Sequence, residues 1–231
     1  MSLDKEMALF CLSLSTAAYT RDYANLPCTD IQPFADVDTD TEGFTGMAAG
    51  NALVIAFTGS NSEADWVNNL RYLRVPYPEV TQNEAINVHY GFYTAYLSVR
   101  TLMHETVESK QPDKVIVTGH SLGGGLATLC ALDIQYNFFP ENPDHPEQVV
   151  AYTFGSPKVG NQAFVDSYNR RVPGTFRIVN GGDGVPWLPR SWQGYEHVDT
   201  LYRIDGSVLR IAFAAKQDHF VPAYHQSLSA L

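Results

Sequence analysis

Short, nearly uninterrupted apolar runs alternate along this chain with longer segments of helical periodicity. The runs are rich in β-branched and aromatic residues, as expected of strands that are buried on both faces. They cover residues 52–58, 114–119, 148–155 and 175–180. The helical patterns cover about residues 3–19, 84–110, 122–138 and 160–170. This alternation predicts an α/β fold in which helices flank a mostly parallel central sheet.

The sheet is expected to be mixed, because the later part of the chain carries a hairpin signal. Two further strand-like runs, 200–205 and 207–213, meet at Asp205-Gly206, a dipeptide typical of tight hairpin turns. Looser segments read as loops between elements, at 36–46, 140–147 and 181–199. Since no linker or repeat divides the 231 residues, we expect a single domain over residues 1–231.

The charge balance restricts the possible partners. Asp and Glu number 25 against 15 Lys and Arg, and the resulting net charge of −10 disfavours nucleic acid. No apolar stretch approaches the roughly 18 to 20 residues that cross a bilayer, so no transmembrane segment is expected. Asp4, Lys5 and Glu6 interrupt any signal-peptide pattern, and we expect a soluble protein. An extracellular location stays open for a chain whose leader has been removed, and the oligomeric state stays open as well.

No cofactor is expected. The three cysteines, Cys11, Cys28 and Cys130, are too few for a disulfide scaffold and lack zinc-site spacing. Cys130 lies in an apolar helical pattern and reads as a core residue. His104-Glu105 lacks a second histidine at metal-ligand spacing, so no metal site is expected either.

The strongest chemical signal is a G-x-S-x-G pattern formed by Gly119, Ser121 and Gly123. A strand-like run ends just before it and an apolar helical pattern begins just after it. A serine on such a sharp turn projects its hydroxyl above the sheet, beside the first amides of the helix. The alternative is a glycine-rich turn with an incidental serine. The flanking strand and helix favour Ser121 as a nucleophile.

This segment resembles the nucleophile elbow of the class 3 (fungal-type) lipases, a family with the α/β-hydrolase fold. Five further blocks agree with that family in order, at 56–70, 88–96, 152–164, 177–189 and 218–224. The resemblance extends from about residue 8 to 228 and implies an α/β-hydrolase-like domain that cleaves esters without a cofactor. One departure is Phe57-Thr58-Gly59, which stands where the family usually has Phe-Arg-Gly.

A serine nucleophile needs a base that is itself oriented by a buried acid. The acids that follow Ser121 include Asp183, Asp199, Asp205 and Asp218. Asp183 comes three residues after the apolar run 175–180, at the edge of an α/β sheet where catalytic groups collect. The resemblance places the family's acid at the same position. We therefore expect Asp183 to be the acid.

The base must be one of the later histidines, which are His145, His197, His219 and His225. The resemblance implies His219, because Asp218-His219 followed by Tyr224 matches the family's pattern there. His225 is the rival base, and His197 is a third candidate that could instead line the rim of the pocket. His120 and His89 are expected to play structural roles.

Two backbone donors are expected to stabilise the developing oxyanion. One is the N–H of Leu122, directly after the nucleophile, and the other comes from Ser60 in the loop after the strand 52–58. Ser60 could also act only as a helix N-cap. In the resembled family the next helix is a lid over the site. Trp66 and Leu70 share one face of that segment and would be lid or substrate-binding residues, unless this face is core.

These residues predict a serine carboxylic-ester hydrolase that works through an acyl-enzyme, with a Ser-His-Asp triad. The resemblance favours a triacylglycerol lipase that meets lipid substrate at an oil–water interface. An esterase for soluble or aromatic, feruloyl-type esters is the alternative, because the lid segment is also rich in polar residues. A non-catalytic relative that binds lipid or a partner protein is a third reading.

Overall fold

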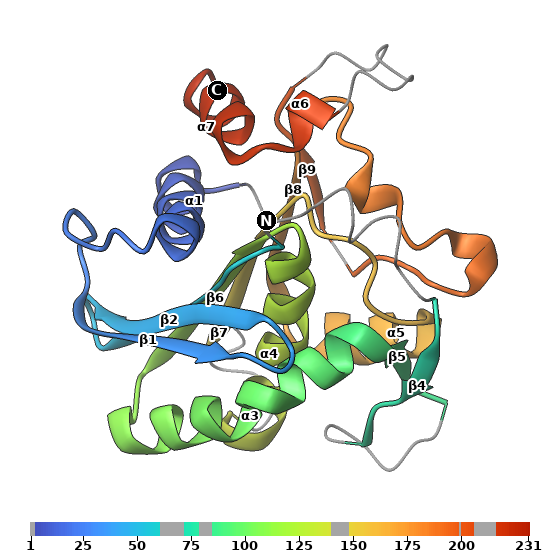
Figure 1. The fold of residues 1–231 in the computed structure, drawn as a ribbon, viewed down its shortest axis with the longest axis horizontal. Helices are drawn as coiled ribbons and strands as arrows, with labels where there is room; N and C mark the ends of the chain where they lie inside the picture. The colour runs from blue at the N-terminus through green and yellow to red at the C-terminus, as the bar shows by residue number, and fades with distance from the viewer. Residues whose placement is uncertain (1–2, 61–71, 79–84, 140–147, 199, 206–215) are drawn as a thin grey trace.

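The central element is a β-sheet of seven strands in the order β1-β2-β3-β6-β7-β8-β9 (Figure 1). The computed structural model describes residues 3–60, 72–78, 85–139, 148–198, 200–205 and 216–231. The strands are β1 Thr29–Asp36, β2 Thr41–Ala48, β3 Ala52–Phe57, β6 Lys114–His120, β7 Val149–Phe154, β8 Gly174–Val179 and β9 Leu201–Arg203. The first three pair antiparallel, and all pairs from β3 to β9 are parallel. The sheet is therefore mixed and mostly parallel, as predicted.

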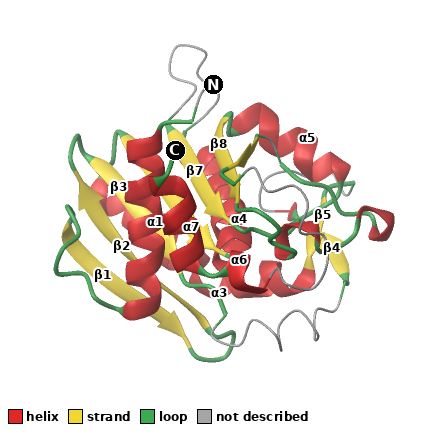
Figure 2. Cartoon of the chain, turned by 90° about the horizontal axis from the view of Figure 1, so that it is seen from above, coloured by secondary structure: helices red, strands yellow, loops and turns green. Residues whose placement is uncertain are grey.

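Helices cover both faces of this sheet (Figures 1 and 2). They are α1 Lys5–Thr20, α3 Tyr90–Lys110, α4 Leu122–Phe138, α5 Gln162–Arg171, α6 Lys216–His219 and α7 Val221–Ser229. Helices α1 and α7 lie side by side on one face, and α3, α4 and α5 cover the other. A small separate sheet pairs β4 Arg74–Pro76 with β5 Asn87–His89. The fold is that of an α/β protein, as the alternating pattern predicts.

The alternation of side chains along each strand divides the interior into two cores. In β3, Leu53 and Ile55 belong to the core beneath α3 and α4, while Val54 and Ala56 face α1 and α7. All four side chains are buried. Because both faces are covered, the strand must be apolar at every position, which is why it reads as an uninterrupted run.

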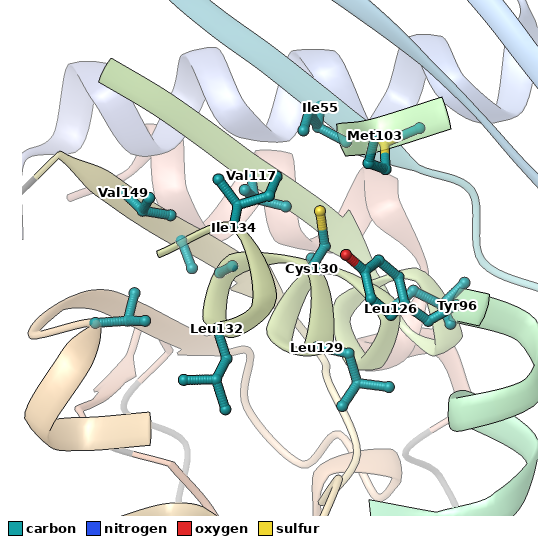
Figure 3. Packing of buried hydrophobic residues seen from close by; sticks show 14 of the residues in the cluster. Ile55, Tyr96, Met103, Val117, Leu126, Leu129, Cys130, Leu132, Ile134 and Val149 are labelled. Atoms are coloured by element: carbon teal, nitrogen blue, oxygen red, sulfur yellow. The ribbon is translucent and has the colours of Figure 1, made fainter. Parts of the chain in front are cut away.

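Helix α4 passes through the larger core, as Figure 3 shows. Cys130 lies there in the same buried cluster as Val117, Ile134 and Tyr96 (Figure 3). Its thiol is free and its pKa is raised by burial, so it remains protonated. Cys130 is a core residue, in agreement with the sequence-based interpretation.

The prediction of a loop over residues 36–46 is wrong, because most of that segment belongs to a hairpin of β1 and β2. Its Gly and Thr content conceals the strand. A Cβ on Gly43 would lie 2.2 Å from the main-chain oxygen of Ala56, so β2 approaches β3 closely only without a side chain there. Packing selects glycine at this position, and glycine lowers the strand signal of the sequence.

Some other predicted elements differ from the structure or lie outside the described residues. Helix α3 begins at Tyr90 and not near residue 84, because β5 occupies Asn87–His89 and the His89 side chain caps the helix. Strand β9 lies within the first of the two late runs and pairs parallel with β8, and its predicted hairpin with the second run is not tested. The second run, 207–213, and the expected loop 140–147 lie outside the described residues.

A buried charge joins α3 to α4. Asp133 of α4 is fully buried, and its carboxylate accepts hydrogen bonds from Arg100 Nε and Nη2, both at 2.9 Å. Tyr96 Oη donates to it at 2.7 Å, and His104 Nε2 lies at 2.6 Å. Tyr96, Arg100 and His104 follow one another at intervals of four residues along α3, so their side chains share the face that meets α4. Asn137 donates a further bond at 2.9 Å.

Within the part of the chain that the structure describes, no helix is long and apolar enough to cross a membrane. The same residues contain no group of three or more histidines, cysteines or carboxylates arranged to hold a metal ion.

Candidate active site

Ser121 occupies the sharp turn between β6 and α4. Its backbone has φ 56° and ψ −126°, a conformation that costs about 1–3 kcal/mol for a residue with a side chain. The glycines on either side permit the close approach. A Cβ on Gly119 would lie 2.2 Å from the Gly123 oxygen, and one on Gly123 would lie 2.5 Å from the Phe57 oxygen. The turn is held by a bond from Ser121 N to Phe154 O at 2.9 Å.

Ser121, His219 and Asp183 form a continuous chain of hydrogen bonds. The distance from His219 Nε2 to Ser121 Oγ is 2.9 Å, and that from His219 Nδ1 to Asp183 Oδ2 is 2.8 Å. All three side chains are buried. A carboxylate can only accept, so Nδ1 carries the proton and Nε2 is free to accept from the serine hydroxyl. These residues come from the ends of β6 and β8 and from α6, which meet at one edge of the sheet.

The Asp183 carboxylate has two further donors. Val185 N donates to Oδ1 at 2.9 Å, and Tyr224 Oη donates to Oδ2 at 2.5 Å. Burial, together with the nearby Asp183 charge, raises the pKa of Tyr224 well above its usual value, so its hydroxyl keeps the proton that it donates. The sequence pattern included Tyr224 but did not indicate this contact. It could not be foreseen because α7 and the loop after β8 meet only in the folded protein.

Gly155 is a site residue that the sequence reasoning did not single out. It follows β7, has φ +59°, and lies against the side chains of Asp183 and His219. A Cβ there would be 2.7 Å from Asp183 Oδ2 and 3.0 Å from His219 Nδ1. The position thus requires glycine both for its backbone conformation and for space. A glycine directly after a buried strand is the only signal in the sequence.

We expect Gly155→Ala to reduce ester turnover about 10- to 100-fold, because the added methyl group displaces the Asp183 carboxylate from the His219 ring. The measurement is kcat/KM on a soluble p-nitrophenyl ester. Gly50→Ala is a matched control, since Gly50 has φ +71° and nothing within 4 Å of its added Cβ. Both variants carry the backbone strain, and only Gly155→Ala should lose activity. Equal activity in the two would contradict this account.

The other candidates for the base and the acid have hydrogen-bond partners outside the Ser121-His219-Asp183 chain. His225 Nε2 lies 3.1 Å from Thr16 Oγ1, on the side of α7 that faces α1. His197 is bonded to the main-chain oxygen of Pro186, and Asp218 accepts a bond from Gly182 N at 3.0 Å. Asp218 lies inside α6, and the N-cap of the following helix is Phe220. The remaining candidate Asp205 lies beside Asp218, since a Cβ on Gly181 would be 3.2 Å from Asp205 Oδ2 and 3.1 Å from Asp218 Oδ2. Asp199 and His145 lie outside the described residues.

The two expected oxyanion donors come from neighbouring segments. Leu122 is the first residue of α4, directly after Ser121. Ser60 follows Gly59, whose Cβ would lie only 2.7 Å from the His120 oxygen, so this loop packs on the end of β6. Thr58 stands in the place of the family's arginine, and its hydroxyl donates to Ala18 O of α1 at 3.2 Å. The loop is thereby anchored to a helix.

The expected lid residues Trp66 and Leu70 lie outside the described residues, as does the helix that Ser60 was expected to cap. His89, expected to be structural, accepts bonds from Gly91 N at 3.1 Å and Phe92 N at 3.4 Å. It therefore caps the N-terminus of α3.

The mostly parallel sheet, the serine on a strand-to-helix elbow and the hydrogen-bonded Ser-His-Asp arrangement at its edge are the features of the α/β-hydrolase fold. Residues 54–192 match the family Lipase (class 3), which is more than half of the chain. The chain belongs to the class 3 lipase family.

Sequence relatives and solved structures agree with this assignment. The chain is 38% identical over 156 residues to a lipase of Rhizomucor miehei, which covers 66% of this chain and 41% of that protein. It is 31% identical over 170 residues to secreted mono- and diacylglycerol lipase 1 of Fusarium solani, covering 71% and 48%. A triacylglycerol lipase with a serine-protease triad superimposes with a TM-score of 0.77 at 28% identity, covering 88% and 81%. The chain spans less than half the length of the two sequence relatives.

Proposed function

We propose that this protein is a serine carboxylic-ester hydrolase of acylglycerols, with Ser121 as nucleophile, His219 as base and Asp183 as acid. The observation that carries the proposal is the chain of two hydrogen bonds, 2.9 Å and 2.8 Å, that joins these side chains. A buried serine that is bonded to a histidine, itself bonded to a carboxylate, is the arrangement that activates a hydroxyl for acyl transfer.

In the first half of the reaction, His219 Nε2 takes the proton of Ser121 Oγ as that oxygen attacks the ester carbonyl. The tetrahedral oxyanion accepts hydrogen bonds from the N–H of Leu122 and from Ser60. As the carbonyl re-forms, the bond to the alcohol oxygen breaks, and His219 gives its proton to the leaving alcohol. Asp183 stabilises the imidazolium throughout and holds its Nδ1–H in place.

In the second half, a water molecule enters where the alcohol left. His219 Nε2 takes a proton from this water as its oxygen attacks the acyl-enzyme carbonyl. The bond to Ser121 Oγ then breaks, and the proton held by His219 returns to the serine. The products are one carboxylic acid and one alcohol, and no redox or metal step is needed.

Two exposed aromatic side chains beside these residues support an apolar substrate. Trp187 comes four residues after Asp183 and is 53% exposed, and Phe220 follows His219 directly and is 45% exposed. Large exposed apolar groups next to a catalytic site are suited to acyl chains or to a lipid–water interface. The relatives named above as lipases of mono-, di- and triacylglycerols favour acylglycerols, and those named as secreted favour action outside the cell.

The direct test combines labelling with turnover. A fluorophosphonate should label Ser121 in the intact protein, as read by peptide mass spectrometry, and the protein should hydrolyse p-nitrophenyl butyrate. A protein that is neither labelled nor active would contradict the proposal and favour the reading of a non-catalytic binder of lipid or protein.

A series of substrate concentrations distinguishes a lipase from the alternative, an esterase for soluble or aromatic esters. The rate on a short-chain triglyceride should rise sharply above its solubility limit if the enzyme acts at a lipid interface. Simple saturation below that limit, together with faster turnover of methyl ferulate, would favour the esterase.

The assignment of the base predicts opposite outcomes for two nearby histidines. His219→Ala should reduce kcat about 10⁴-fold, because the serine loses its proton acceptor. His225→Ala should retain near-normal activity, because its contact is with Thr16 of α1 and not with Ser121. Initial rates on the same ester give the comparison. Loss of activity in His225→Ala with retention in His219→Ala would refute the assignment.

A further inference from the structure

His120, the residue directly before the nucleophile, is bonded to the backbone of the base. Its Nε2 lies 2.6 Å from the main-chain oxygen of His219. The two imidazole rings also contact each other, with centroids 4.6 Å apart and planes inclined by 37°. His120 is buried, and its ring edge meets Tyr224, the residue that donates to Asp183. It thus touches the base and the partner of the acid.

The hydrogen-bond partners determine the tautomer of His120. A carbonyl oxygen can only accept, so Nε2 must carry the hydrogen. Burial, reinforced by the neighbouring His219, lowers the pKa of His120 to about 3, so the ring is neutral near pH 7 and Nδ1 has no hydrogen. The Tyr19 hydroxyl lies 2.9 Å from Nδ1 and must therefore be the donor. Tyr19 of α1 holds His120 in the one form that can bind the His219 carbonyl.

The Tyr19 hydroxyl also lies against the loop that carries Ser60. A Cβ on Gly59 would be 1.9 Å from this hydroxyl and 2.7 Å from the His120 main-chain oxygen. Tyr19 and His120 therefore fill the space between the start of that loop and the base. The buried His120 and the partly buried Tyr19 thus contact both the oxyanion side and the base side of the site.

We propose that Tyr19 and His120 are positioning residues. They hold the backbone of His219 in the position from which its ring reaches both Ser121 and Asp183. This inference rests on the proposed function, in which His219 is the base. The side chains act through the His219 carbonyl and do not touch the substrate.

The position of His219 explains why such a contact matters. It ends α6, a helix of only four residues, which cannot by itself fix the direction of a side chain. The peptide before it is held by Asn180 Nδ2, which donates to Asp218 O at 3.0 Å. The hydrogen bond from His120 Nε2 fixes the following carbonyl, that of His219. His120 is the residue directly before Ser121. The nucleophile and the backbone of the base are thus both held by the end of β6.

Three variants test the proposal in the full-length protein. Tyr19→Phe removes one hydroxyl and should lower kcat about 10-fold, as the loss of one hydrogen bond of about 1.4 kcal/mol does. His120→Leu should lower kcat about 100-fold, because the base is displaced, with KM changed less than threefold. His120→Gln retains an N–H donor near the position of Nε2 and should recover most of the activity lost in His120→Leu.

Ser15→Ala is the matched control for loss of stability. Its hydroxyl bonds to Thr118 Oγ1 at 3.1 Å, so it removes another buried contact between α1 and β6 away from the histidines. Steady-state kinetics and thermal unfolding are measured on all four variants and on the unaltered protein. Ser15→Ala should lower the unfolding temperature without lowering kcat.

The outcomes distinguish a failure of the positioning role from a failure of the proposed function. Rescue by His120→Gln, together with a fall in kcat for Tyr19→Phe, supports the positioning role. If Tyr19→Phe keeps normal kcat, or if His120→Gln is as impaired as His120→Leu, the inference is overturned while the proposed function stands. If the unaltered protein shows neither turnover nor labelling at Ser121, the proposed function fails and the inference fails with it.

Discussion

Replacing Ser121 with alanine is expected to reduce ester turnover by about four to six orders of magnitude while leaving the fold intact. The substitution removes the oxygen that attacks the carbonyl in the proposed reaction, which lies 2.9 Å from His219 Nε2. The remaining turnover would come from the oxyanion donors and from substrate binding, which stabilise the transition state without a covalent step. The substitution should therefore abolish the acyl-enzyme and leave weak background hydrolysis.

The measurement for Ser121→Ala is the initial rate on p-nitrophenyl butyrate, with active-site labelling and thermal unfolding in parallel. The midpoint of unfolding should change little, because the side chain is small and loses one hydrogen bond. Residual turnover within tenfold of the unaltered protein would contradict the role of Ser121. A large fall in the unfolding midpoint would mean that lost structure, and not lost chemistry, explains the result.

Replacing Asp133 with alanine is expected to have the largest effect on stability, about 3–5 kcal/mol in the free energy of unfolding. The carboxylate is fully buried and accepts bonds from Arg100, Tyr96 and Asn137. Its removal leaves the partly buried guanidinium and the buried tyrosine hydroxyl without their acceptor, between two helices that cannot easily separate. The cost comes mainly from these unpaired donors.

Urea unfolding monitored by circular dichroism measures the Asp133 effect. Arg21→Ala serves as the control, because Arg21 forms an exposed ion pair with Glu42 at 2.7 Å, a type of contact with little effect on stability. Asp133 lies far along α4 from the elbow, so the folded variant should keep its kcat. An unfolding midpoint equal to that of Arg21→Ala would refute the role of the buried cluster.

The sequence predicted the sheet best where its strands are covered on both faces, and the elbow where strand, glycine and helix occur together. Strand β3 was recognisable because both of its faces are apolar, whereas β2 was missed because packing against β3 requires Gly43. The hydrophobic pattern of a sequence indicates buried apolar side chains. It does not indicate a strand that packs through its backbone, as β2 does at Gly43.

The candidate site shows the same limit. Asp183 and His219 could be named because each lies in a recognisable sequence pattern, and the hydrogen bond between them links separate segments of the chain. Gly155, Tyr224 and Tyr19 could not be assigned roles, because their contacts join residues that are far apart in the chain. Such contacts depend on the relative placement of helices and loops, which one sequence does not report.

The two helices on one face of the sheet, α1 and α7, carry side chains that reach the candidate site. Tyr224 of α7 bonds to Asp183, and Tyr19 of α1 bonds to His120. Detachment of this pair of helices would release the acid from one donor while the parallel strands remained paired. Activity should therefore be lost on heating before the sheet melts, so that enzyme inactivation and loss of the β-structure signal follow separate temperature curves.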